Sequence, residues 1–185
     1  LLKPGLQEYS YELGFVRRNF GTDSNNYGRP LAVGTHRLGI TDQFTGEIHG
    51  ELLGQQQTLG LGGVLLLPAA GVLSGSFAAS HSDRGVGGLL ELGFQRQGRY
   101  VSFGANTQLA SQRFEKLGLE PEALAPRQIS QMFVNLATTD YGSFRANYTQ
   151  QAFRDRTGNK ILSAGYSRKV GRQGNLTASV TRLLS

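Results

Sequence analysis

Residues 59–80, LGLGGVLLLPAAGVLSGSFAAS, decide between two folds, because this stretch is uncharged and long enough to cross a bilayer as one helix. Five glycines, three serines and a central Pro68 oppose the helix, since glycine and proline destabilise helix interiors. From Leu73 to Ser80 the residues alternate with a period of two: Leu73, Gly75, Phe77 and Ala79 on one side and Ser74, Ser76, Ala78 and Ser80 on the other. The stretch therefore predicts a β-hairpin of residues 58–67 and 72–81, joined by a Pro-Ala-Ala-Gly turn.

The same alternation recurs along the whole chain and predicts an all-β protein. Each segment approaches the ten residues that a tilted membrane strand needs, so we expect an antiparallel up-and-down meander of about eleven long strands, part of a transmembrane β-barrel. Residues 127–137 fit least well, because Met132 and Phe133 point to opposite faces. The alternation is seen at Tyr9–Phe15, Phe44–Leu52, Leu90–Phe94, Val101–Leu109, Phe144–Tyr148, Leu162–Tyr166 and Leu176–Val180, and weaker segments lie at 31–40, 58–67, 72–81 and 127–137.

The polar face of these strands favours a membrane barrel over a soluble β-sandwich. A sandwich usually has shorter strands and more charge on its outward face. Here the polar positions are mostly Ser, Thr, Asn, Gln and Gly, which is typical of a water-filled lumen. The residues predicted to face the lumen are Glu12, Glu47, His49, Glu51, Glu91, Ser102, Asn106, Arg145 and Asn147.

The lengths of the links between strands give independent support. Outer-membrane barrels keep short turns on the periplasmic side and longer loops outside. Short links at 41–43, 68–71, 96–99, 138–142 and 171–174 alternate with longer ones at 20–29, 81–88, 113–126 and 152–159. The link near 54–57 is an exception, because it is short where this alternation expects a long link. We expect the two sets to lie at opposite ends of the strands.

Several kinds of chemistry find little support in the sequence. The chain has no cysteine, and His36, His49 and His81 lie in separate segments without metal-ligand spacing. Its net charge of +6 comes from scattered basic residues, whereas nucleic-acid binding needs clustered ones. An enzyme on a barrel would need a Ser and a His facing one another from neighbouring strands. His49 and Ser102 would be arbitrary choices for such a pair, so we predict no catalytic residue. We likewise predict no cofactor, no metal and no nucleic-acid partner.

Five stretches resemble one family, the outer-membrane ushers of chaperone–usher fimbriae. They are LLKPGLQEYSYELGFVRRN (1–19), THRLGITDQFTGEIHGE (35–51), LSGSFAASHSDRGVGG (73–88), GSFRANYTQQAFRD (142–155) and ILSAGYSRKVGRQGNLTASVTR (161–182). The resemblance covers nearly the whole chain through many strand-level matches. It implies that residues 1–185 are part of an usher barrel, without the family's N-terminal, plug and C-terminal domains. Both ends of the sequence look like cuts through a longer chain, so we expect an open sheet with unpaired first and last strands.

The resemblance also implies a function. Ushers are pores in the bacterial outer membrane that receive periplasmic chaperone–fimbrial subunit complexes, promote subunit polymerisation and pass the fibre outward. They use no cofactor, and their partners are those complexes and outer-membrane lipid. Another outer-membrane barrel, such as a porin or an autotransporter translocator, would share the strand pattern and stays an alternative.

Overall fold

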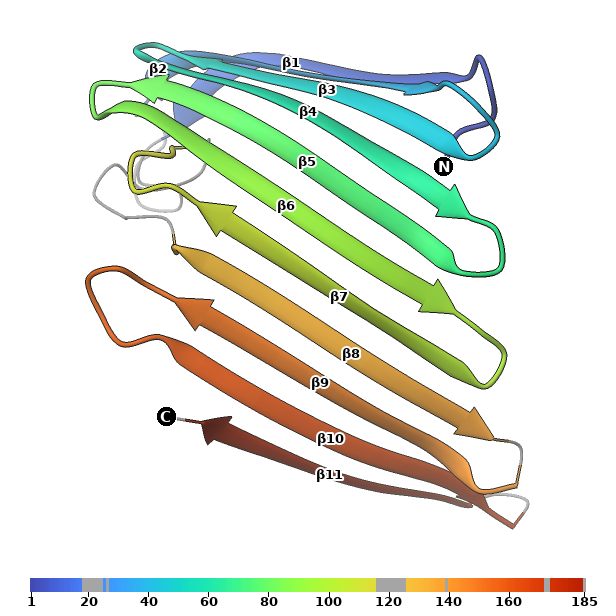
Figure 1. Ribbon diagram of the computed structural model, residues 1–185. Helices are drawn as coiled ribbons and strands as arrows, with labels where there is room; N and C mark the ends of the chain where they lie inside the picture. The colour runs from blue at the N-terminus through green and yellow to red at the C-terminus, as the bar shows by residue number, and fades with distance from the viewer. Residues whose placement is uncertain (18–24, 26, 116–125, 139, 172–173, 185) are drawn as a thin grey trace. The chain divides into compact units, whose positions relative to one another are not determined.

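The computed structural model describes residues 1–17, 25, 27–115, 126–138, 140–171 and 174–184, which form eleven strands and no helix. The strands follow one another in the sheet in chain order, as an antiparallel up-and-down meander (Figure 1). In this order β1 and β11 are the edge strands, and no pairing joins them among the described residues. The strands are β1 Gln7–Arg17, β2 Tyr27–Gly39, β3 Phe44–Leu53, β4 Gln56–Leu67, β5 Gly71–Ser82, β6 Gly85–Gln97, β7 Val101–Ala110, β8 Gln128–Thr138, β9 Gly142–Ala152, β10 Asn159–Val170 and β11 Gly174–Leu184.

The stretch 59–80 forms the predicted hairpin, β4 and β5, and the prediction of eleven strands in an open sheet is confirmed. In the described part of the chain, no helix is long and apolar enough to span a membrane. The turn between β4 and β5 places Ala69 at φ 61° and Gly71 at φ 145°. Glycine suits the second position for a further reason, because a Cβ there would lie 2.5 Å from the Gln95 carbonyl oxygen.

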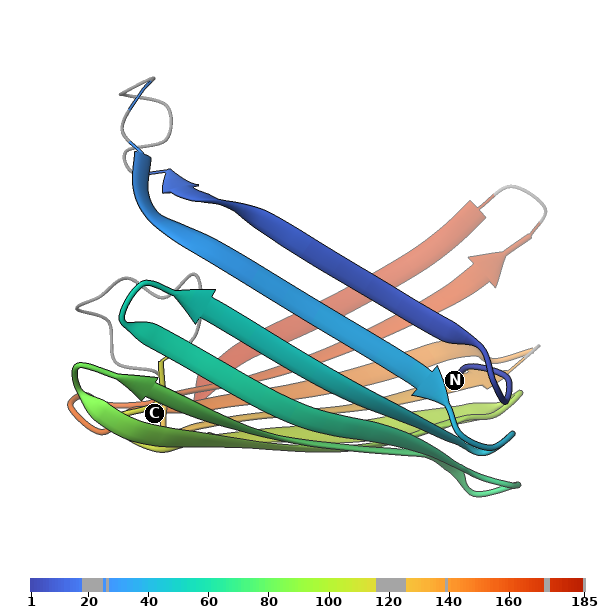
Figure 2. The same cartoon turned by 90° about the horizontal axis from the view of Figure 1, so that it is seen from above.

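The chain divides into two compact units, each described here by itself. Unit 1 comprises Leu1–Leu65, Gly75–Leu90 and Ala110–Ala125, and unit 2 comprises Leu66–Ser74, Glu91–Leu109 and Pro126–Ser185. In unit 1, β1 to β4 pair in antiparallel register, with one shift in β1 between Phe15 and Arg17, and the long ribbon of β1 and β2 is seen in blue in Figure 2. The backbone N–H of Leu2 donates a hydrogen bond to Thr45 Oγ1 (2.8 Å), which ties the N-terminal segment to β3.

In unit 2, β7 to β11 pair in continuous register. Here Phe133 lies opposite Gly104, where a Cβ would come within 2.6 Å of the Phe133 ring. The missing side chain explains how a phenylalanine fits on the polar face of β8, the strand whose pattern was hardest to interpret from the sequence.

The links between described strands follow the predicted scheme with one correction, and the predicted 20–29 loop lies outside the described residues up to the start of β2 at Tyr27, apart from residue 25. Successive antiparallel strands send alternate links to opposite ends, so in unit 2 the links 68–70, 98–100, 139–141 and 171–173 leave from one end and 153–158 from the other. In unit 1 the predicted long link at 81–88 is wrong. β5 continues to Ser82 and β6 begins at Gly85, which leaves a two-residue turn.

Candidate pore-lining face

The register of unit 1 gathers four predicted lumen residues on one face. Glu12 pairs with Val33, Val33 with Glu51, and Glu51 with Thr58, so these side chains share a level across β1 to β4. Glu47 and His49 lie on the same side of β3 as Glu51, because side chains two residues apart point the same way. We call this set, together with Glu8, Thr35 and Arg37, the charged face of unit 1.

Arg37 organises the charges on this face, and the sequence analysis did not identify it. Its Nη1 lies 2.7 Å from Glu8 Oε2, and its Nε lies 3.3 Å from Glu47 Oε2. The Arg37 side chain is 32% exposed and those of Glu8 and Glu47 are 60% and 42% exposed, so water weakens both ion pairs. The sequence did carry a signal: a hairpin turn at 40–43 makes Arg37 and Glu47 direct cross-strand partners.

His49 lies in a chain of hydrogen bonds that has the residue types of a catalytic triad but not its surroundings. Its Nδ1 is 2.8 Å from Thr35 Oγ1, and its Nε2 is 3.0 Å from Glu51 Oε1. Acyl-transfer chemistry also needs free N–H donors for an oxyanion beside the nucleophile. β2 pairs on both sides, with β1 and β3, so the backbone N–H groups around Thr35 are used by the sheet. We interpret the chain of hydrogen bonds as one that orients His49.

A short segment after β7 packs on this same face. The Glu115 N–H donates to Ser80 Oγ (3.0 Å), Thr58 Oγ1 donates to the Glu115 carbonyl (3.2 Å), and Arg84 Nε lies 3.1 Å from Glu115 Oε1. Phe114 is only 3% exposed and clusters with Leu89 and Ala110. We call residues 111–115 the strap; the rest of the predicted 113–126 loop, up to 125, lies outside the described residues.

A glycine explains how the strap fits. A Cβ on Gly87 would lie 2.2 Å from the Phe114 nitrogen, so only glycine leaves room for the strap backbone. Ser111 secures the other end, because its N–H donates to the Gly88 carbonyl and its Oγ accepts from the Gly88 N–H, both at 2.8 Å. The Gly-rich start of β6, predicted as part of a loop, is therefore a strand that carries the strap.

The remaining predicted lumen residues share one face of unit 2. Ser102 pairs with Asn135 and Asn135 with Arg145, while Asn147 is opposite Phe133, on the same side as Arg145. Asn106 lies on this side of β7. A Cβ on Gly93 of β6 would lie 3.6 Å from Asn106 Nδ2, so Gly93 faces the same side. Glu91, two residues before Gly93, therefore points to that side as well. Small polar residues continue this hydroxyl-rich face of unit 2 over β10 and β11: Ser163, Gly165, Ser167, Thr177, Ser179 and Thr181.

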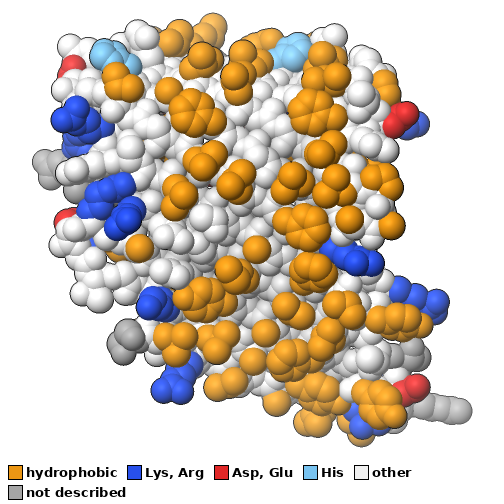
Figure 3. All heavy atoms as spheres, in the orientation of Figure 1, with side chains coloured by type: hydrophobic (Ala, Val, Ile, Leu, Met, Phe, Trp, Pro, Cys, Tyr) orange, Lys and Arg blue, Asp and Glu red, His pale blue; other side chains and the backbone are white. Residues whose placement is uncertain are grey.

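The opposite, outward faces are apolar and exposed. Leu13 is 86% exposed and Leu59 58% in unit 1, and Val180 is 65% and Leu162 42% in unit 2. Figure 3 shows one face of the molecule, where hydrophobic side chains gather along the strands and Lys and Arg side chains lie toward the strand ends. Such a surface is unfavourable in water and favourable against lipid.

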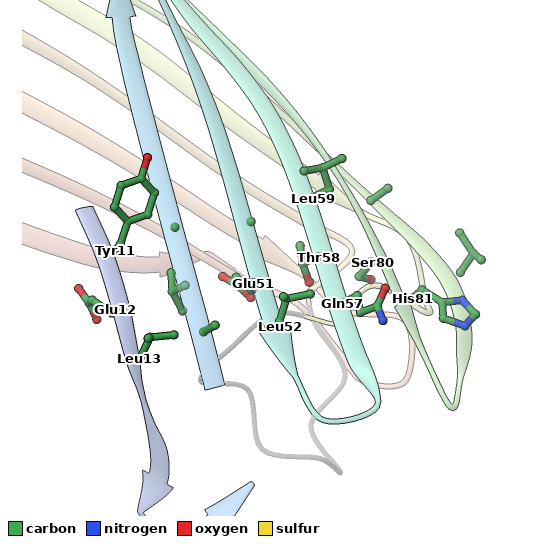
Figure 4. A pocket seen from close by; sticks show the side chains of 16 residues that line it. Tyr11, Glu12, Leu13, Glu51, Leu52, Gln57, Thr58, Leu59, Ser80 and His81 are labelled. Atoms are coloured by element: carbon green, nitrogen blue, oxygen red, sulfur yellow. The ribbon is translucent and has the colours of Figure 1, made fainter. Parts of the chain in front are cut away.

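Unit 1 also has a hollow of about 650 Å³, lined mainly by outward-facing rows of β1 to β4 (Figure 4). The paired glycines Gly34 and Gly50 are part of its lining, as are Leu13, Leu52 and Leu59. Its lining is mostly apolar, so the hollow extends the lipid-compatible surface, and Glu12, Glu51 and His81 also line it.

The fold is that of part of a large antiparallel β-barrel wall with one polar and one apolar face. Among solved structures, the chain is similar to the P pilus usher (PapC) translocation pore, with a TM-score of 0.81 and 18% identity over 100% of this chain and 40% of that one. It is also similar to a chain of the E. coli P pilus tip assembly intermediate PapC-PapD-PapK-PapG, with a TM-score of 0.83 and 18% identity over 100% of this chain and 25% of that one.

A further structure of the usher PapC translocation pore gives a TM-score of 0.67 and 15% identity over 98% of this chain and 46% of that one. The chain thus spans less than half of each of these chains. No family model and no curated protein matches the sequence. The structural likeness establishes the fold: an antiparallel sheet of the kind that forms the barrel wall in these usher structures.

Proposed function

We propose that this chain forms part of the wall of an outer-membrane usher pore, which assembles fimbrial subunits and passes them across the bacterial outer membrane. The observation that carries the proposal is the division of the sheet into a polar and an apolar face within an usher-type fold. In it, the charged face of unit 1 and the hydroxyl-rich face of unit 2 line the lumen, and the outward faces contact lipid.

The polar face suits the passage of a folded protein rather than its tight binding. On β10 and β11 it consists of short side chains that bond to one another, such as Ser163 Oγ and Thr181 Oγ1 at 3.1 Å. Side chains whose hydrogen bonds are already made offer a moving partner only weak contacts. The proposed partners are chaperone–subunit complexes on the periplasmic side and lipid around the barrel. The wall acts as a conduit and not as an enzyme.

Site-specific photocrosslinking of the full-length protein in cells that assemble fimbriae tests the proposal. A crosslinker at Asn147 or Glu12 is expected to capture fimbrial subunits in transit, and one at Ala146, on the outward face, is not. The absence of subunit adducts from Asn147 and Glu12 during fimbrial assembly would contradict it. If loss of the protein leaves fimbriae intact and lowers uptake of small solutes, the porin alternative is correct.

A further inference from the structure

The outward face of unit 2 changes from apolar to polar at a boundary that crosses β7 to β11. On β9, Phe144, Ala146 and Tyr148 are followed by Gln150, and on β10, Tyr166, Ala164 and Leu162 are followed toward the loop end by Lys160. The register places Gln150 and Lys160 side by side, together with Ser130 on β8. The change is therefore a property of the sheet and not of one strand.

The polar side chains beyond this boundary are organised as a band. Ser130, only 4% exposed, lies 3.1 Å from Thr107 Oγ1 and accepts from Gln128 Nε2 at 2.9 Å. Tyr148 donates its hydroxyl hydrogen to Gln150 Oε1 at 3.0 Å, so its ring stays in the apolar region while its hydroxyl group reaches the polar one. Tyrosine takes this position at membrane interfaces, where one end of the side chain is apolar and the other is wet.

The first polar positions of the outward face lie level across four strands. Thr107 of β7, Ser130 of β8, Gln150 of β9 and Lys160 of β10 are successive cross-strand partners. On β11 the polar position is Arg182, two residues nearer mid-strand than Leu184, the partner of Lys160. The boundary therefore crosses β7 to β10 at one level of the register.

The length of the apolar run agrees with a strand that crosses a membrane at the usual tilt. The outward position of Arg168 ends the apolar run of β10 at the short-turn end, eight residues from Lys160. Eight residues span about 27 Å along a strand, or roughly 20 Å along the membrane normal at a tilt near 40°. The apolar band of outer-membrane barrels is about 25 Å tall.

Two basic side chains, Lys160 and Arg182, lie at the loop end of the apolar band. Lys160 pairs with Leu184, and Arg182 with Leu162, so Lys160 and Arg182 are diagonal neighbours on the outward face. Diagonal neighbours have their Cβ atoms roughly 7–8 Å apart, within reach of one phosphate for two long side chains. Both are exposed, and neither forms an ion pair with another described residue.

We propose that the outward face of β7–β11 defines the membrane plane, and that Lys160 and Arg182 bind the phosphate of an anionic glycolipid headgroup at the loop end. The inference rests on the proposed function, because it requires the outward face to meet a bilayer. Longer links mark the loop end as the external side, so the lipid belongs to the outer leaflet. Guanidinium and ammonium groups are the usual phosphate ligands, and Lys or Arg beside an anionic surface contributes ~1 kcal/mol each.

The test uses the full-length protein folded in phosphatidylcholine nanodiscs and titrated with fluorescent lipid A. In the double variant Lys160→Gln/Arg182→Gln, the apparent affinity for lipid A is expected to fall roughly 30-fold, which is the fold-change that ~1 kcal/mol for each of the two cations gives. Added salt should reduce the difference. The matched control is Arg145→Gln, which removes a cation from the opposite face and should bind lipid A as the wild type does.

The outcomes separate this inference from the proposed function. Wild-type protein that does not fold in a bilayer would contradict both. Protein that folds there, but whose affinity for lipid A is unchanged in the double variant or falls equally in Arg145→Gln, would contradict the phosphate site alone.

Nitroxide labels on single cysteines test the position of the membrane plane. Labels at Ala146 and Ala164 should be exposed to oxygen, and one at Gln150 to a water-soluble nickel complex. The reverse pattern would contradict the boundary.

Discussion

The charged face of unit 1 and the hydroxyl-rich face of unit 2 have the same strand period but different means of stabilisation. In unit 1, Arg37 joins two glutamates, and the strap buries Phe114 against Leu89. In unit 2, short polar side chains on β10 and β11 bond to one another across the two strands, as Ser167 Oγ does to Asn175 Oδ1 at 3.3 Å. Alternation therefore determines which face is polar, while individual side chains determine whether that face holds a segment in place or leaves its surface clear.

The largest expected effect concerns the strap. Phe114→Ala removes a ring that is 3% exposed and leaves a cavity beside Leu89 and Ala110. The free energy of unfolding of the full-length protein in detergent should fall by about 3–5 kcal/mol, as for other buried phenylalanines. Phe133→Ala in unit 2, where the ring is only partly buried, should cost less. Equal losses at the two positions would remove the distinction between the units.

The next effect compares the two faces of β7. Phe103→Arg places a cation on the outward face near mid-strand and should cost ~2–4 kcal/mol, whereas Ser102→Arg on the hydroxyl-rich face should cost far less. Leu92→Arg on β6 should behave like Phe103→Arg. A denaturant titration of protein refolded into vesicles measures all three. Similar losses for Phe103→Arg and Ser102→Arg would show that the faces are wrongly assigned.

A turn in unit 2 should show a smaller effect. Gly142 has φ 85°, and a Cβ there would lie 2.4 Å from the Ser167 carbonyl oxygen. Gly142→Ala should therefore lower the free energy of unfolding by roughly 1–3 kcal/mol through backbone strain. Gly171, with φ 64° and open space around it, is the matched control: Gly171→Ala meets the φ strain without the clash. If Gly171→Ala lowers the free energy of unfolding as much as Gly142→Ala does, the effect comes from the positive φ alone and not from the clash with Ser167.

The smallest effect concerns the ion pairs of unit 1. Arg37→Gln should lower the free energy of unfolding by no more than ~1 kcal/mol, since both pairs are open to water. The loss should shrink in high salt, because exposed charges are screened. Unfolding titrations at low and high salt test this expectation. A loss that is large and independent of salt would mean that Arg37 is structurally central to the charged face.

Much of the fold could be predicted from the sequence because period-two alternation is a local signal. The eleven strands and the composition of the two faces follow from residues a few positions apart. The Gly-rich stretch 85–88 was misread because glycines display no alternation. Its role depends on Phe114, which is distant in the sequence and packs where Gly87 has no side chain. Arg37 was missed for a related reason: its ion pairs join β1 to β3, and they appear only once the register is known.

The most direct test of the account is an alternating cysteine scan of β3 and β10, which the absence of cysteine from this sequence makes simple. Single cysteines are placed at 47, 48, 49 and 51 and at 162, 163, 164 and 165 in the full-length protein in native outer membranes. A bulky charged thiol reagent is then applied. We expect labelling at 47, 49, 51, 163 and 165 and protection at 48, 162 and 164. Labelling that ignores this alternation, or reverses it, would contradict the claim that the polar face lines a pore and the apolar face meets lipid.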